Sequence, residues 1–288
     1  MRTYQDVSKE IILLEDVLKI SEQDLADSLG VSLETIHNWK NNLKQIEDSN
    51  VDKLYGFANR KGIMVNKLYE QLLKEEHETV NSVVLFHGAK KDLSLPVDFH
   101  RHSKSNNDFG KGFYLGESFE QASAYIANSG NNRVYSFKLN FSDLKTTRMN
   151  VNNDWMLAVA YYRGWLEDYS DSPVLQEIIS GVQTADLIIA PIADNRMFDI
   201  IQEFAEGEIT DLQCEHALAA TDLGNQYVVR TDKAVRSLEL LREMFVSSDE
   251  KKQYIENNIS LTKTGLSKVR LTRIEYRGKG KYIEELLK

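Results

Sequence analysis

Residues 108–126, DFGKGFYLGESFEQASAYI, join a glycine-rich turn to a short apolar run and a helical pattern. Gly110 and Gly112 stand two apart, a spacing that lets the chain turn sharply or bring its backbone close to another group. Tyr114 follows them, and Tyr125 comes eleven residues later in the predicted helix. Read alone, the stretch is either a turn with core aromatic residues or part of a ligand site. It is not a P-loop or a dinucleotide fingerprint, because neither GK[ST] nor GxGxxG occurs.

Other segments place this stretch in a mixed fold. Short β-type runs are followed irregularly by helical patterns, which favours α+β over a doubly wound sheet. The predicted strands cover residues 82–88, 133–141, 185–192 and 226–231, with predicted helices at 119–127 and 196–207. A further strand over 269–277 and a last helix over 281–288 are expected. The charged stretch Lys74 to Asn81 is the predicted linker between an all-α module and this region.

Three separate signatures then carry a resemblance. VVLFHGAKK, residues 83–91, is an apolar strand that ends in His87 and Gly88; residues 108–126 follow, and LGNQYVVRT, residues 223–231, comes third. Together they resemble the NAD-binding core of poly(ADP-ribose) polymerase-type ADP-ribosyltransferases, a split-β-sheet fold. In that superfamily the third segment begins Asn-Glu-Tyr, whereas this chain has Gln226 at the Glu position. The chain is also similar to a group of bacterial domains of this fold without assigned function.

The resemblance implies roles for named residues. His87 would hydrogen-bond the ribose hydroxyls of NAD, and the Gly88 backbone would hold the nicotinamide carboxamide. Tyr114 and Tyr125 would sandwich the nicotinamide ring between two aromatic faces. Gly112 would let the backbone approach the cofactor. NAD is then the substrate, and no metal is required for breaking its glycosidic bond.

Two departures from the family pattern matter. Ala122 stands where the family has a serine that contacts the carboxamide, although Ser123 is adjacent. Gln226 can hydrogen-bond a ribose hydroxyl, but it cannot deprotonate an acceptor or carry negative charge. We therefore expect mono-ADP-ribosyl transfer or slow NAD hydrolysis rather than polymer synthesis. Gln226→Glu is expected to raise turnover, unless a carboxylate such as Glu215 or Asp222 already fills that role.

The segment SEQDLADSLGVSLETIHNWKNN, residues 21–42, predicts a helix, a tight turn and a second helix. Ser21 and Ser32 are the expected N-caps and Gly30 the turn residue. The buried side is expected to contain Leu25, Ala26, Leu29, Ile36 and Trp39. With the helices predicted after it, the segment resembles the helix-turn-helix unit of phage-repressor-like regulators, over residues 10–73.

DNA binding by this module is one of two readings. The side chains available to base edges or phosphates are Glu34, His37, Asn38, Lys40, Asn41 and Lys44. Residues 1–80 hold 10 basic and 15 acidic side chains, so phosphate attraction is weak. The alternative reading is a helical module for protein docking or dimerisation.

Composition excludes a mostly disordered chain, a collagen-like chain and a membrane bundle. Hydrophobic residues make up 42% and charged residues 27% of 288, as in globular proteins, and no apolar run is long enough to span a membrane. The N-terminus lacks a signal-peptide pattern, and Cys214 is the single cysteine, so a cytoplasmic location is expected. The histidines and Cys214 lack compact metal-ligand spacing; that set comprises His87, His100, His102, Cys214 and His216.

Charge is uneven along the chain. The total is −9, yet residues 250–288 hold 10 basic and 5 acidic side chains. This basic extension would contact nucleic acid or an acidic partner, or else pack on the acidic body of the protein. Arg163 is interpreted as a surface or helix-pairing residue, with a pyrophosphate contact as the alternative. Asp194 is interpreted as a turn residue.

The predicted organisation is therefore an all-α module over residues 8–75, an NAD-binding domain over 80–246 and a basic extension over 247–288. The first hypothesis is a mono-ADP-ribosyltransferase with a macromolecular acceptor, a toxin paired with an antitoxin or a phage-defence effector. The second is a non-catalytic, nucleotide-binding transcriptional regulator that binds DNA through its helix-turn-helix. Repressor-like modules commonly pair, so a homodimer is also expected.

Overall fold

The computed structural model describes residues 7–193, 195–219 and 224–288. Its chain opens with α1 (Ser8–Leu18), α2 (Glu22–Leu29), α3 (Leu33–Lys40), α4 (Asp48–Arg60) and α5 (Val65–His77). Ser21 and Asp24 form a capping box at the start of α2, and Gly30 ends that helix in the left-handed conformation. Ser32 caps α3 by accepting the Thr35 backbone N–H. The predicted caps and turn are confirmed.

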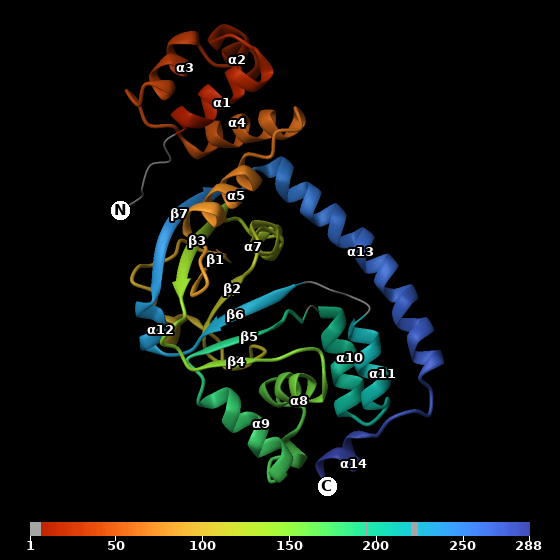
Figure 1. The fold of residues 1–288 in the computed structure, drawn as a ribbon. Helices are drawn as coiled ribbons and strands as arrows, with labels where there is room; N and C mark the ends of the chain where they lie inside the picture. Colours follow the sequence, from red (N-terminus) through yellow and green to blue (C-terminus); the bar gives the residue numbers. More distant parts are fainter. Residues whose placement is uncertain (1–6, 194, 220–223) are drawn as a thin grey trace.

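The helical module packs around the apolar positions that the sequence predicts. Leu25, Ala26, Leu29, Ile36 and Trp39 are all buried. Residues of α1 and α4 complete this core, and so does Phe245, which belongs to a strand of the sheet far along the chain. The module is the upper group of red and orange helices in Figure 1. Its core is therefore continuous with a side chain of the next domain.

One seven-stranded sheet forms the centre of the second region. Its strands are β1 (Ser82–Gly88), β2 (Phe113–Gly116), β3 (Arg133–Asn140), β4 (Thr146–Arg148), β5 (Leu187–Pro191), β6 (Asn225–Val229) and β7 (Leu238–Phe245). Their order is β4-β5-β6-β2-β1-β3-β7, and every neighbouring pair is antiparallel except β4 and β5. The predicted α+β class is confirmed.

The sheet is divided between β1 and β2. β1 pairs with β3 from Ser82 through Gly88, and β2 pairs with β6 along its whole length. Between β1 and β2, however, only Phe86 and Gly116 are in register. Two half-sheets thus meet at a narrow join.

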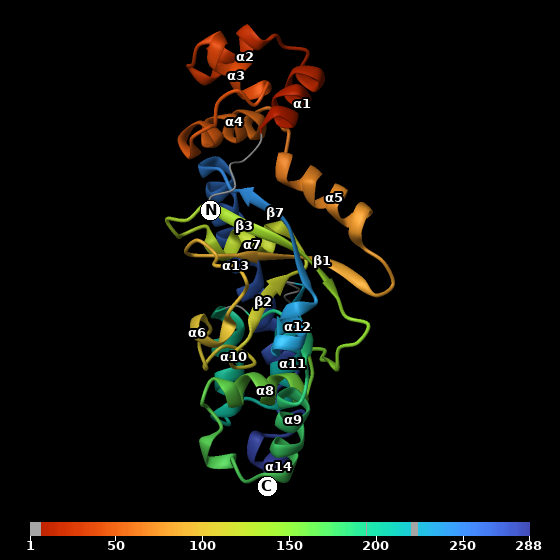
Figure 2. The ribbon, with the colours of Figure 1, turned by 90° about the vertical axis from the view of Figure 1, so that its left-hand side faces the viewer.

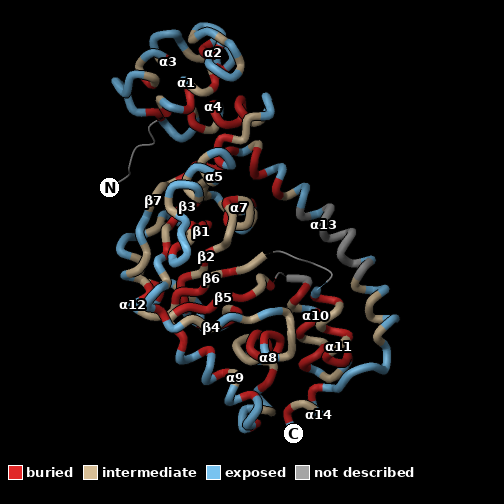
Figure 3. The backbone as a smooth tube through the Cα atoms, in the orientation of Figure 1, coloured by how far each residue is buried: buried red, intermediate tan, exposed pale blue. Residues whose placement is uncertain are grey.

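Helices cover both halves of the sheet. They are α6 (Phe99–His102), α7 (Phe119–Ile126), α8 (Asn153–Tyr162), the 3-10 turn η1 (Glu167–Tyr169), α9 (Pro173–Gln183), α10 (Asn195–Ala205), α11 (Asp211–Ala219) and α12 (Asp232–Arg236). Helix α7 packs on β1, whereas α8, α10 and α11 pack together beside the other half-sheet (Figures 1 and 2). Buried residues concentrate in the strands and these helices (Figure 3).

The C-terminal extension is helical. Helix α13 (Ser248–Glu275) starts at a capping box formed by Ser247 and Glu250, contacts α4 and α7, and reaches α11 about 40 Å further on. In Figure 1 it runs along the side of the molecule as a long blue rod. The short α14 (Ile283–Leu287) then buries its two apolar ends in the core of α8–α11.

The prediction of a strand over residues 269–277 is wrong, because most of this range belongs to α13. Val269, Arg273 and Tyr276 are spaced by four and three residues, so they also share one helix face, which packs toward α10 and α11. Tyr276 stacks on His216 with ring centroids 3.9 Å apart, and Arg273 pairs with Glu203. These contacts fix the segment as helix. Two basic residues of the extension, Lys263 and Lys268, have side chains that lie outside the described part of the chain.

Strand β7 is not predicted from the sequence. Its residues, LELLREMF, lack the β-branched side chains typical of strands. Pairing with β3 along the sheet edge makes the segment a strand nevertheless. Within the described ranges, no helix is both long and apolar enough to cross a membrane.

Candidate functional site

His87 lies at the point where the sheet divides. Its Nδ1 is 2.8 Å from the Tyr114 carbonyl oxygen, across the gap beyond the single registered pair of β1 and β2. A carbonyl only accepts, so Nδ1 carries the proton and Nε2 is left as an acceptor. Burial lowers the pKa of His87 below its ordinary 6.5, which favours this neutral form. The imidazole also packs on the Phe113 ring at 4.3 Å.

Gly88, the next residue, touches α7. A Cβ added there would lie 2.1 Å from the Ala122 carbonyl oxygen, so no larger residue fits without moving the helix. Ser123, beside it, is fully buried and its Oγ makes no hydrogen bond within the described residues. The strand end and α7 therefore meet backbone to backbone, next to a hydroxyl without a partner.

The Tyr114 side chain is fixed by its own loop. Its hydroxyl donates to the Gly110 carbonyl oxygen at 2.7 Å and accepts from the Phe109 N–H at 3.2 Å. Burial raises the phenol pKa well above its usual range. Gly110 has φ +73°, and a Cβ at Gly112 would lie 2.6 Å from Val228 Cγ1. Both glycines are thus explained by a turn and by close packing on β6, and the Gly112 N–H is already bonded to Ser103 Oγ.

Tyr125 is placed differently. It lies on α7 and is 62% exposed, and the Lys90 ammonium sits 4.5 Å from its ring centroid. Tyr114 and Tyr125 do not touch among the ring contacts of the described residues. The two rings expected to sandwich nicotinamide therefore lie on two elements, β2 and α7, that pack against each other.

Gln226 is buried on the same side of the sheet as Tyr114. It lies opposite Gly116 in the β2–β6 register, and Tyr114 is two residues along from Gly116. Its Nε2 donates to Asp108 Oδ2 at 2.9 Å and to the Pro191 carbonyl oxygen at 3.0 Å. His87 belongs to the opposite side by strand alternation, where Phe113 packs, and reaches Tyr114 only through the backbone.

Two residues of this cluster were not assigned to it from the sequence. Asp108 is 6% exposed, and its Oδ1 accepts from Arg163 at 2.6 Å. The Arg163 guanidinium also lies 3.7 Å from the Phe198 ring centroid. Arg163 is therefore a half-buried partner of Asp108 rather than a surface residue. Position 108 directly precedes the FGKG run, which is the signal that could have drawn attention to it.

The two carboxylates suggested from the sequence as substitutes for the missing glutamate, Glu215 and Asp222, are not seen beside Gln226 among the residues that the structure describes. Glu215 is half-buried on α11, and Asp222 lies outside the described residues, as does Asp194. The charged group beside Gln226 is Asp108 instead, which is 118 positions away in the chain.

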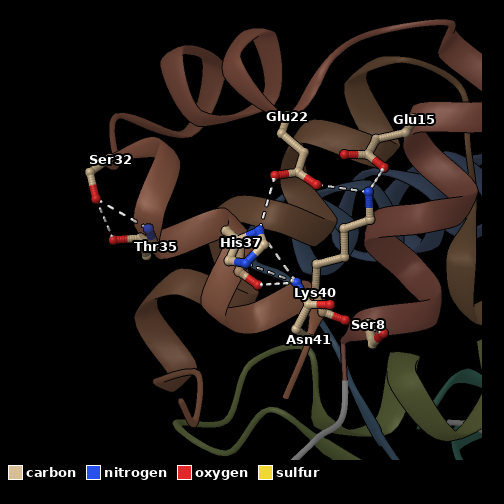
Figure 4. Close-up of polar contacts among 8 residues, drawn as sticks. All are labelled: Ser8, Glu15, Glu22, Ser32, Thr35, His37, Lys40 and Asn41. Atoms are coloured by element: carbon tan, nitrogen blue, oxygen red, sulfur yellow. Dashed lines mark hydrogen bonds and ion pairs between the residues drawn. The ribbon is translucent and has the colours of Figure 1, made fainter. Parts of the chain in front are cut away.

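The helical module holds the second predicted site. Lys40 Nζ donates to Glu15 Oε2 at 2.7 Å and to Glu22 Oε1 at 2.8 Å, and these hydrogen bonds raise its pKa (Figure 4). His37 Nδ1 is 3.8 Å from Glu22 Oε2, and Asn41 donates to the His37 carbonyl oxygen at 2.8 Å. Thus three of the six candidate side chains for DNA contact, His37, Lys40 and Asn41, interact within the module. Asn38 is half-buried, and Glu34 and Lys44 are exposed.

The structure groups no metal ligands among the residues it describes. His100 is 3.1 Å from Asp232, His216 stacks on Tyr276, and Cys214 is buried. Cys214 is a core side chain, and its burial raises the pKa of the thiol well above its ordinary value.

Comparison with known proteins gives a family but no activity. No curated protein and no solved structure matches the chain. Residues 83–240 match the family described as "Protein of unknown function (DUF3990)". That range contains β2 to β6, nearly all of β1 and the residues His87, Tyr114 and Gln226, and it covers more than half of the chain. The protein therefore belongs to the DUF3990 family.

Proposed function

We propose that residues 80–246 form an ADP-ribosyltransferase-like domain that uses NAD as substrate and transfers ADP-ribose to a macromolecular acceptor. The bond between nicotinamide and ribose C1′ breaks, and nicotinamide leaves with the bonding electron pair. An acceptor atom bonds to C1′ and releases its proton. Reaction with water in place of the acceptor is slow NAD hydrolysis.

The observation that supports this proposal best is the arrangement of β1, β2 and β6. His87-Gly88, Tyr114 and Gln226 come from three distant parts of the sequence and lie on three adjacent strands. The join between β1 and β2 is closed by the His87 side chain rather than by a regular ladder. Polar side chains on both sides of the sheet beside such a join favour a ligand site there.

The residues present fit the substrate. Gln226 Oε1, on the same side of the sheet as Tyr114, has no hydrogen bond among the described residues and suits a ribose hydroxyl, whereas the His87 Nε2 acceptor lies on the opposite side of the sheet. Tyr114 and Tyr125 offer aromatic rings from two packed elements for the flat nicotinamide.

The direct test uses purified protein, NAD labelled in the adenine ring, and cell lysate. We expect nicotinamide release together with label on a macromolecule. Gly88→Ala should lower nicotinamide release at least tenfold, because the new Cβ displaces α7 from the strand end. Gly181→Ala is the matched control: nothing lies within 4 Å of that site, in the helix α9, so turnover should stay unchanged.

The two glycine variants also differ in stability. Gly181→Ala should stabilise the protein by about 0.5–1 kcal/mol, since alanine favours a helix interior. A folded wild-type protein that neither releases nicotinamide nor transfers label would overturn the proposed activity.

One observation favours a second candidate function. Gln226 is a neutral amide where the resembled family has a carboxylate, so binding without chemistry fits the site as well. In that case the domain is the nucleotide-binding part of a transcriptional regulator. NAD would then raise the melting temperature without any release of nicotinamide.

We propose a docking role for the helical module. Lys40 is held by two carboxylates of its own module, and the module is acidic, so its surface suits a protein better than phosphates. A second copy of the chain or an antitoxin is the proposed partner, which agrees with a toxin or phage-defence effector. Size-exclusion chromatography with light scattering, together with affinity capture, tests both partners.

A further inference from the structure

The orientation of the Gln226 amide is set by its neighbours. The side chain is 7% exposed, and both of its recorded partners, Asp108 Oδ2 and the Pro191 carbonyl oxygen, only accept hydrogen bonds. The amide nitrogen must therefore face them. Each of its two N–H groups is used, and Oε1 points elsewhere without a recorded partner among the described residues.

Asp108 is itself held firmly. Arg163 donates to its Oδ1, so the two carboxylate oxygens divide between Arg163 and Gln226. The guanidinium balances the negative charge at 2.6 Å, and the contact with Phe198 positions that guanidinium. The ion pair with Arg163 keeps the Asp108 carboxylate in a fixed position.

We propose that Asp108 is a positioning residue that fixes the Gln226 amide with Oε1 toward the substrate ribose. The neutral amide then presents the hydrogen-bond acceptor that a glutamate would supply in the resembled family. This inference rests on the proposed function, because it names NAD ribose as the group that Oε1 meets. The pairing of Asp108 with Gln226 explains why a buried acid stands directly before the glycine-rich turn.

The pairing changes the expected effect of Gln226→Glu. Two carboxylates would face each other at the distance now occupied by a 2.9 Å hydrogen bond, so one of them would have to hold a proton. The variant should therefore lose turnover instead of gaining it. Asp108→Asn combined with Gln226→Glu restores a donor opposite an acceptor, and the Asn oxygen can still accept from Arg163.

The experiment measures kcat and KM for nicotinamide release in four variants. Asp108→Asn should lower kcat about 10²-fold with KM changed much less, because the Gln226 amide can then turn its oxygen toward the Asn N–H. Gln226→Glu should fall at least tenfold below wild type, and the double variant should recover at least tenfold over Gln226→Glu. Glu203→Gln, which removes the carboxylate that pairs with Arg273, should leave both constants unchanged.

A second measurement does not depend on activity. With 15N-labelled glutamine, the Gln226 side-chain amide protons should exchange slowly in wild type and rapidly in Asp108→Asn. Melting temperatures of all variants show whether each is folded; if Asp108→Asn fails to fold, the comparison of Gln226→Glu with the double variant decides.

The outcomes separate the two proposals. An active wild type with unchanged kcat in Asp108→Asn, or with higher turnover in Gln226→Glu, overturns the positioning role alone. A folded wild type with a protected Gln226 amide that neither binds NAD nor releases nicotinamide overturns the proposed function, and the assignment of ribose with it.

Discussion

Lys40 in the helical module and Gln226 in the divided sheet both stand in clusters of charged and polar side chains. Around Lys40, two carboxylates of the same module take up the ammonium. Around Gln226, Asp108 and the Pro191 carbonyl oxygen accept from the amide nitrogen, and the amide oxygen has no partner among the residues that the structure describes. The Lys40 cluster is therefore internal to the module, whereas the Gln226 cluster contains the acceptor that we propose for a ligand.

The difference shows that a residue type at a given spacing does not determine which groups its side chain will contact. A lysine on a predicted recognition helix suggests phosphate contact, but its three donors serve whichever acceptors the fold brings close. A glutamine at a carboxylate position suggests a lost function, but its neighbours can fix it as an acceptor. In both cases the hydrogen-bond partners determine which atoms of the side chain are available, and those partners lie far away in the sequence.

The largest expected effect concerns the junction between the two regions. Glu10 of α1 is 1% exposed and pairs with Arg242 of β7 at 2.8 Å, with the Tyr55 hydroxyl as a further donor. Arg242→Ala would leave this carboxylate buried without a cation, so we expect a loss of about 3–5 kcal/mol in the free energy of unfolding. Urea unfolding followed by circular dichroism measures this loss.

The matched control for Arg242→Ala is Lys288→Ala, which removes an exposed pair with Glu284 and should cost less than about 1 kcal/mol. Because Tyr69 packs against the core of the module and also against the core formed by β1 and α7, wild type should unfold in one transition. Two separate transitions in wild type would show that the module and the sheet are energetically independent.

Much of the fold was predictable from local patterns. The caps at Ser21 and Ser32 depend on side chains within three residues, and the apolar runs of β1, β3, β5 and β6 are continuous in the sequence. The strand β7 was not predictable, because it is a strand only through its pairing with β3. The end of α13 was not predictable either, since contacts with α10 and α11 hold it as a helix.

The candidate site also contains residues that could be predicted from the sequence and residues that could not. Gly110 and Gly112 were identified from their spacing, because a sharp turn is a local requirement, whereas Gly88 was assigned only through the family resemblance and its close approach is to Ala122, 34 positions away. Asp108 and Arg163 were not assigned to it, since their pairing with each other and with Gln226 spans 55 and 118 positions of the chain. Periodicity carries no information about such contacts.

The second prediction concerns acid pH and His87. Burial lowers the folded-state pKa of this imidazole below 6.5, so the unfolded chain binds more protons between the two pKa values. Stability from this group is therefore complete above about pH 6.5 and falls as the pH decreases toward the folded-state pKa. The loss is at most about 1.4 kcal/mol per pH unit in that window.

His87→Asn tests the assignment of this acid-dependent loss. Asparagine can place an amide nitrogen near the position of Nδ1 and keep the bond to Tyr114, but it does not titrate. The difference in unfolding free energy between pH 7.5 and 5.5 should become smaller in the variant. An equal difference in both proteins would assign the acid sensitivity to other groups.

The smallest expected effect returns to Lys40. Lys40→Ala removes an internal ion pair with Glu15 and Glu22, so we expect a stability loss of about 1 kcal/mol or less. Affinity for a fluorescent DNA duplex at low salt should not change. Lys44→Ala, at an exposed position of the same module, is the matched control.

The two lysine variants decide between the roles of the module. If the duplex binds at all, Lys44→Ala should weaken binding and reduce its salt dependence, whereas Lys40→Ala should not. A larger loss in Lys40→Ala would mean that phosphate competes successfully with two carboxylates for the ammonium. The Lys40 cluster would then be a ligand site that opens on binding, and the contrast with Gln226 would no longer hold.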